Sequence, residues 1–161
     1  MATVYLGLGS NLGDRRAHLA HGLRRLDEVY GLTGISSVWE TDPVGFEDQP
    51  RFLNLVARLE TEAGPRAVLD TARAIEEERG RERTAERNGP RTLDIDLLLH
   101  GDRMGDEEGL RVPHPRMTQR AFVLVPLLEL DTRLVDPRTG ERIAGLDAAA
   151  PSARGGMEKV M

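Results

Sequence analysis

The sequence predicts an α+β domain in which helices pack on one side of an antiparallel sheet. Three observations support this class. Strand-like and helix-like segments follow one another in the order strand, helix, strand, strand, helix, strand. Gly- and Pro-containing stretches separate these segments, and one more apolar helical segment follows the last strand. The order matches the split βαβ, or ferredoxin-like, arrangement βαββαβ, with an additional C-terminal helix and a short tail.

The first predicted strand covers residues 3–9 (TVYLGLG). The GLGSN segment that ends it is expected to form a tight turn and a helix cap, with Asp14 among the capping residues. Leucines at helical spacing then predict the first helix, which Gly31 and Gly34 are expected to end.

Two further strands are predicted on either side of a loop. Residues 35–41 (ISSVWET) are rich in β-branched and aromatic side chains, and the loop 42–50 contains Pro and Gly. Residues 52–60 (FLNLVARLE) alternate, so Phe52 and Asn54 share one face of the strand while leucines share the other.

The second helix is expected to begin at Pro65 and to stop at Gly80. The strand LDIDLLLH, residues 93–100, comes after an arginine-rich run.

The last third of the chain is predicted to contain less regular structure. Residues 101–109 (GDRMGDEEG) are expected to form a loop. Residues 121–130 predict a helix interrupted near Pro126, because proline lacks the N–H that a helix requires. Residues 151–161 are expected to form a flexible tail, within a single domain spanning residues 1–161.

Composition restricts the classes of partner. The net charge of −5 argues against nonspecific nucleic-acid binding, so no nucleic-acid partner is expected. The chain has no cysteine, which excludes disulfides and thiolate metal sites. No apolar run is long enough to span a bilayer, and MATVYLGLGS does not resemble a secretory signal. We therefore expect a cytoplasmic protein without a membrane partner.

Two aspartates interrupt the apolar strand 93–100. Asp94 and Asp96 are two residues apart, so both carboxylates project from the same face of the strand, about 7 Å apart. Hard divalent cations prefer such oxygen ligands, and Mg²⁺ commonly uses one or two carboxylates together with substrate phosphates. The alternative is that this face is simply solvated.

Five arginines lie immediately before this strand, in residues 78–91: Arg79, Arg81, Arg83, Arg87 and Arg91. One interpretation is a solvated helix in which Glu and Arg pair at i,i+4 spacing. The other is a loop that brings cations to phosphate oxygens and excludes water. Neither the P-loop nor the protein-kinase motifs occur in the sequence.

Four segments together resemble the 6-hydroxymethyl-7,8-dihydropterin pyrophosphokinase family of folate biosynthesis. They are GLGSNLGDR (7–15), ETDPVGFEDQPRFLN (40–54), GRERTAERNGPRTLDIDLL (80–98) and VPHPRMTQRAF (112–122). The resemblance extends to about residue 146 and implies transfer of pyrophosphate from Mg-ATP to the pterin hydroxymethyl oxygen, with release of AMP. Two other functions stay open at this point: a noncatalytic ligand-binding module and a Mg-dependent nucleotide hydrolase.

The resemblance implies that Asp94 and Asp96 bind two Mg²⁺ ions, with Asp96 nearest the attacking oxygen. It implies catalytic roles for Arg81 and Arg91, and we expect Arg91 to contact the transferring group.

The resemblance also implies nucleotide contacts from six residues: Glu76, Arg83, Arg87, Leu97, His114 and Arg120. For two of these residues, the sequence also allows a purely structural role. His114 lies between prolines and is also suited to capping a loop, and Glu76 is also suited to a solvated helix surface.

The pterin site implied by the resemblance consists of Thr41, Pro43, Val44, Phe52, Asn54 and Phe122. Phe52 and Phe122 would stack on the flat pterin, while Thr41 and Asn54 would hydrogen-bond its edge. The alternative for each phenylalanine is a place in the core. The chain departs from the family at Asn88, Gly109 and Pro115, where aromatic or arginine side chains often occur.

Overall fold

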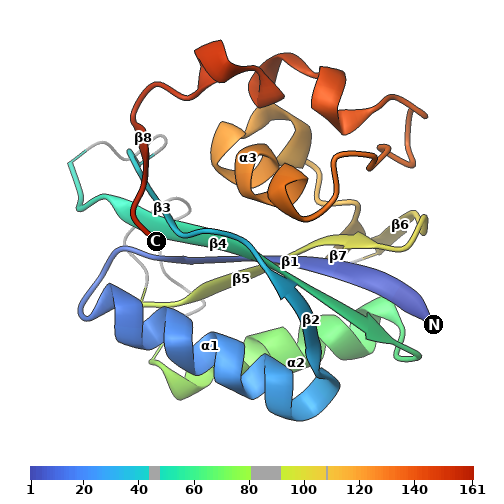
Figure 1. Ribbon diagram of the computed structural model, residues 1–161. Helices are drawn as coiled ribbons and strands as arrows, with labels where there is room; N and C mark the ends of the chain where they lie inside the picture. The colour runs from blue at the N-terminus through green and yellow to red at the C-terminus, as the bar shows by residue number, and fades with distance from the viewer. Residues whose placement is uncertain (44–47, 81–91, 108) are drawn as a thin grey trace.

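The computed structural model describes residues 1–43, 48–80, 92–107 and 109–161. These residues form a layered structure in which a sheet lies between two groups of helices (Figure 1). The strands are β1 (Ala2–Ser10), β2 (Leu32–Ile35), β3 (Trp39–Thr41), β4 (Phe52–Thr61), β5 (Asp94–His100), β6 (Gly105–Glu107), β7 (Leu110–Val112) and β8 (Met157–Lys159). The α-helices are α1 (Arg15–Tyr30), α2 (Pro65–Glu78) and α3 (Ala121–Leu130). Short 3₁₀ helices are η1 (Met117–Gln119), η2 (Ile143–Gly145), η3 (Asp147–Ala149) and η4 (Pro151–Ala153).

The main sheet confirms the ferredoxin-like prediction. Its strand order is β5-β1-β4-β3-β8, and β2 also pairs with β4. All of these pairings are antiparallel. The two central strands, β1 and β4, are also the longest, and they pair over nine residues from Ala2↔Thr61 to Ser10↔Leu53.

Each face of the sheet is covered by its own hydrophobic core. On one face α1 and α2 pack over side chains such as Leu6, Leu8 and Leu55. On the other face α3 and the 3₁₀ helices pack over a second cluster that includes Tyr5 and Val56. The alternation predicted for residues 52–60 is therefore confirmed, since Leu55 and Val56 belong to different cores.

The predicted helix boundaries are largely confirmed. The carboxylate of Asp14 caps α1 by accepting the Ala17 N–H at 3.1 Å. Gly31 ends α1 with a φ of 79°, and Gly80 follows α2 with the same φ. Pro65 is the first residue of α2, as expected.

The prediction of one strand over residues 35–41 is wrong in its boundaries. Ile35 is the last residue of β2, residues 36–38 belong to no strand, and β3 begins at Trp39. Gly34 lies inside β2 instead of ending α1. The interruption falls at Ser36, whose side-chain Oγ accepts the Val56 N–H at 2.8 Å. A side chain thus replaces a backbone partner where the strand breaks.

Strand β5 contains an irregularity that the sequence does not reveal. Leu6 pairs with Leu97 whereas Tyr5 pairs with Leu99, so one extra residue lies on β5 between them. Leu99 consequently joins Leu98 in the core beneath α3 instead of sharing a face with Leu97. Strict strand alternation would put Leu97 and Leu99 on one face, and the extra residue in β5 is the reason that they lie in different cores.

Three further predictions for the last third of the chain differ from the structure. Residues 101–109, expected to form a loop, contain β6, which pairs antiparallel with β7 just beyond them. Helix α3 continues through Pro126 without interruption. The expected flexible tail contains β8, which pairs with β3, because β3 has an otherwise open edge.

Candidate active site

A cavity of about 250 Å³ lies between the sheet and the chain around α3. Its lining residues are Gly7, Leu8, Gly9, Thr41, Asp42, Phe52, Asn54, Leu55, Asp94, Asp96, His114, Pro115, Arg116, Arg120, Phe122 and Val123. Segments from four parts of the sequence therefore meet here: β1, β3 to β4, β5, and residues 114–123.

Asp94 and Asp96 both line this cavity from β5. They pair with Gly9 and Gly7 of β1, respectively, and both are partly exposed. The two carboxylates therefore face a shared space in which the neighbouring strand contributes no side chains. Strand alternation predicts this common orientation.

At position 9 of β1, only glycine leaves enough room for the side chains of β4. A Cβ at this position would lie 2.8 Å from Asn54 Oδ1 and 3.6 Å from Phe52 Cδ1. The expectation that GLGSN forms a tight turn is wrong for its glycines, because β1 continues through Ser10. Alternation in TVYLGLG was the available signal, since it puts Gly7 and Gly9 on the face opposite Leu6 and Leu8.

The side of the cavity away from β5 is lined by Thr41 of β3 and by Phe52 and Asn54 of β4. Thr41 pairs with Phe52 across β3 and β4. The buried Asn54 Nδ2 donates a hydrogen bond to Thr41 Oγ1 at 2.6 Å. The amide and the hydroxyl are thus held in one orientation beside an aromatic ring.

Phe122 lines the cavity from the first turn of α3. The guanidinium of Arg120 lies over its ring, with Cζ 5.5 Å from the ring centroid. Both phenylalanines are partly buried in the cavity wall, so neither is a plain core residue.

His114 reaches the cavity beside Asp96. Its Nδ1 accepts the Arg116 N–H at 3.2 Å, and its Nε2 lies 4.0 Å from Asp96 Oδ2. Burial lowers the pKa of His114 from 6.5 to about 4, and the positive charge of Arg120 acts in the same direction. The ring is therefore neutral at pH 7, and the Nδ1 contact puts its proton on Nε2, toward the aspartate.

Three predicted site residues in the described ranges, Glu76, Leu97 and Pro43, do not line the cavity. Glu76 is buried at 4% exposure, and its Oε2 accepts the Ile95 N–H at 2.8 Å. The alternative of a solvated Glu76 is therefore wrong, since this carboxylate supports β5 between the two aspartates. Leu97 packs in the core beneath α1 and α2. Its side chain therefore points away from the cavity.

Five predicted residues fall outside the described ranges, at positions 44 and 81–91. They are Val44, Arg81, Arg83, Arg87 and Arg91.

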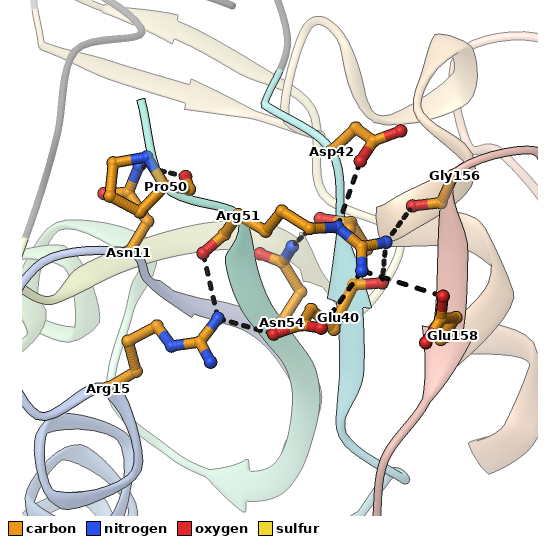
Figure 2. A network of polar contacts seen from close by, with 10 residues as sticks. Asn11, Arg15, Glu40, Asp42, Pro50, Arg51, Asn54, Gly156 and Glu158 are labelled. Atoms are coloured by element: carbon orange, nitrogen blue, oxygen red, sulfur yellow. Dashed lines mark hydrogen bonds and ion pairs between the residues drawn. The ribbon is translucent and has the colours of Figure 1, made fainter. Parts of the chain in front are cut away.

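A polar network next to Thr41 was not predicted (Figure 2). Arg15 of α1 donates to Glu40 Oε2 at 2.8 Å, and Arg51 donates to Glu40 Oε1 at 3.0 Å. The hydrogen bond from Arg15 keeps the pKa of Glu40 below its ordinary value. Asn11 completes the link by donating to the Pro50 carbonyl at 3.0 Å. The network therefore holds Pro50 and Arg51, which precede β4, against Glu40 of β3 and Arg15 of α1.

Comparison with known proteins identifies the family. Residues 5–132 match the family described as 7,8-dihydro-6-hydroxymethylpterin-pyrophosphokinase (HPPK). The chain belongs to this family. The resemblance inferred from the four sequence segments, and the expectation of an enzyme, are thereby confirmed. The noncatalytic module and the nucleotide hydrolase are not favoured.

Relatives named 2-amino-4-hydroxy-6-hydroxymethyldihydropteridine pyrophosphokinase are similar along most of their length. The Pseudomonas aeruginosa protein is 46% identical over 153 residues, covering 92% of this chain and 91% of the relative. The Bacillus subtilis protein is 45% identical over 129 residues, covering 79% and 77%.

Solved structures support the fold. A Plasmodium falciparum HPPK-DHPS triple mutant with pteroate superposes with a TM-score of 0.73 at 14% identity. The alignment covers 98% of this HPPK-family chain but spans only 46% of that longer chain. Within the described ranges, the structure contains no helix with the length and apolarity needed to span a membrane.

Proposed function

We propose that this HPPK-family chain transfers pyrophosphate from Mg-ATP to the hydroxymethyl group of 6-hydroxymethyl-7,8-dihydropterin and releases AMP, as a step of folate biosynthesis. The observation that carries this proposal is one cavity in which an acidic pair lies beside an aromatic and amide surface. Such a cavity would suit two substrates of different chemistry: a charged polyphosphate and a flat heterocycle.

The acidic pair suits Mg²⁺. Asp94 and Asp96 offer hard carboxylate oxygens on one face, and the glycines opposite leave room beside them. The described residues contain no cluster of three or more His, Asp or Glu that would enclose a metal by protein ligands alone. Phosphate oxygens and water would therefore complete the coordination, as is usual for Mg²⁺. Two bound ions would neutralise phosphate charge and make the hydroxymethyl oxygen a better nucleophile.

The opposite part of the cavity suits the pterin. Phe52 and Phe122 would contact the faces of the ring, and Arg120 would leave its position over Phe122 when the pterin enters. Asn54 and Thr41 would hydrogen-bond the edge of the pterin, since their mutual hydrogen bond already fixes both groups. Rigid placement of the acceptor oxygen toward the metal site lowers the entropic cost of reaction.

His114 and Arg120 would bind phosphate oxygens. The neutral His114 directs an Nε2–H toward the acidic pair, so it can donate to a phosphate without adding a charge. Arg120 is a charged donor at the same end of the cavity.

Glu76 would act through the β5 backbone rather than by touching the nucleotide. Leu97 would contribute only backbone contacts. The family resemblance adds six residues to the proposal. Arg81 and Arg91 would be catalytic, Arg83 and Arg87 would contact the nucleotide, and Pro43 and Val44 would contact the pterin. We also propose that the chain is a single cytoplasmic domain. Its partners would be ATP and the pterin, without nucleic acid or membrane.

The test is incubation of the pure protein with Mg-ATP, with and without the hydroxymethyl dihydropterin, followed by chromatography of the nucleotides. We expect AMP and the pterin pyrophosphate in equal amounts, and only when the pterin is present. AMP formed without pterin would instead indicate a nucleotide hydrolase. Folded protein that releases no AMP would indicate a binding module.

A further inference from the structure

The C-terminal segment, residues 154–161, lies along the strand that carries Thr41. Strand β8 pairs with β3, and Met157 lies opposite Thr41. Beyond the strand, the Asp42 N–H donates to the Gly156 carbonyl at 3.1 Å. Both Thr41 and Asp42 line the cavity. The three-residue strand β3 is therefore held by β4 on one side and by the C-terminal segment on the other.

Arg51 joins this segment to the cavity wall (Figure 2). Its Nε donates to Asp42 Oδ1 at 3.0 Å, and one terminal nitrogen donates to the Gly156 carbonyl at 2.9 Å. The other terminal nitrogen donates to Glu40 Oε1 at 3.0 Å. The Arg51 guanidinium thus connects Glu40 and Asp42, on either side of Thr41, with the C-terminal segment. In the sequence, Arg51 directly precedes Phe52.

Gly156 occupies a position that other residues do not fit. Its φ is 77°, and a Cβ there would overlap Asp42 Oδ2 and lie 2.9 Å from Asp42 Cγ. Gly155, by contrast, has no atom within 4 Å of where its Cβ would be. The close approach is therefore specific to Gly156 and to the cavity-lining Asp42.

Trp39 anchors the same segment next to the site. Its indole Nε1 donates to Glu129 Oε2 at 2.7 Å. The Lys159 ammonium and the Arg154 guanidinium lie 5.4 and 5.8 Å from the ring centroid. Two cations of the C-terminal segment thus pack against one buried ring of β3.

We propose that residues 154–161 support the pterin site without lining it, with Gly156 and Arg51 as positioning residues for the cavity-lining Thr41 and Asp42. This inference rests on the proposed function. It extends the pterin-binding apparatus beyond residues 5–132, the part of the chain that matches the family. Neither Gly156 nor Arg51 touches the phosphate end of the cavity, so their effect falls on pterin binding and not on ATP binding.

The test compares Gly156→Ala with the matched control Gly155→Ala. Titration of pterin fluorescence would give the dissociation constant of the hydroxymethyl dihydropterin, and steady-state kinetics would give KM for ATP and kcat. We expect Gly156→Ala to weaken pterin binding about tenfold, because hydrogen bonds to charged groups are misaligned. KM for ATP and kcat at saturating pterin should stay within twofold, and Gly155→Ala should match the wild type.

Arg51→Gln gives an independent measure. This variant should also weaken pterin binding about tenfold. The double variant Arg51→Gln/Gly156→Ala should weaken it by clearly less than a hundredfold, because both changes disturb the same contacts among Arg51, Asp42 and Gly156. Unaltered pterin binding in Gly156→Ala, or an equal loss of ATP and pterin binding, would overturn the inference. Wild-type protein that forms no AMP with both substrates would refute the proposed function itself, which is a separate result.

Discussion

Gly9→Ala should damage the pterin end of the cavity without changing its charge. The added Cβ would lie 2.8 Å from Asn54 Oδ1, closer than carbon and oxygen normally approach. Asn54 is only 9% exposed and is held by a 2.6 Å hydrogen bond to Thr41, so it cannot move without losing that bond. The substitution should therefore either strain the packing of β1 against Asn54 or break the buried hydrogen bond between Asn54 and Thr41.

Either outcome costs about 1–3 kcal/mol by the usual magnitudes for overpacking and for a buried unsatisfied polar group. If the whole cost falls on the liganded geometry of Asn54, the dissociation constant of the pterin rises by roughly 5- to 150-fold. Equilibrium titration with the hydroxymethyl dihydropterin measures this constant, and thermal denaturation measures the accompanying loss of stability.

Two controls isolate the mechanism. Gly105→Ala, in β6, should leave pterin affinity unchanged, since its Cβ would lie 3.7 Å from Val112 Cγ1, an ordinary contact. In an Asn54→Ala background, Gly9→Ala should have little further effect, because the obstructed atom is gone. Wild-type affinity in Gly9→Ala, or full additivity of the two changes, would show that contact with Asn54 is not the reason for glycine at position 9.

Two other predictions follow from the site. Asp96→Ala should stay folded, because Asp96 is partly exposed, yet pterin-dependent AMP release should fall by at least 10²–10³-fold; largely intact activity with an unchanged melting temperature would contradict the metal assignment. Because the pKa of Glu40 is lowered in the folded state, its contribution to stability is present above about pH 4.5 and is lost as pH falls through the folded pKa. The melting temperature of Glu40→Gln should therefore lie below that of the wild type at pH 7, and the difference should disappear as pH falls through the folded pKa of Glu40; a gap independent of pH would contradict this.

Local patterns in the sequence were sufficient for the features that depend on one element. The alternation in DIDLL puts Asp94 and Asp96 on one face, and the alternation in FLNLV puts Phe52 beside Asn54. Both predictions hold in the structure because strand geometry alone determines which side chains share a face. The order of such elements was likewise enough to predict the sheet.

Features that depend on contacts between distant segments were missed. The requirement for Gly9 arises only when β1 pairs with β4 and Asn54 lies opposite it. The extra residue in β5 shows itself only through its register with β1. The role of Arg51 depends on a C-terminal segment 105 residues away, whose Gly, Glu and Lys residues are typical of a flexible tail. The polar composition of residues 151–161 favoured a flexible tail. The pairing of β8 with the edge strand β3 depends on a distant segment, so no local pattern in the sequence indicates it.

The most direct test of the account is a crystal structure with a nonhydrolysable ATP analogue, the pterin and Mn²⁺ in place of Mg²⁺. Anomalous scattering would locate the metal without reference to the surrounding geometry. We expect manganese bound to the carboxylates of Asp94 and Asp96 and to phosphate oxygens, with the pterin between Phe52 and Phe122. Manganese elsewhere, with both carboxylates facing only solvent, would contradict the account.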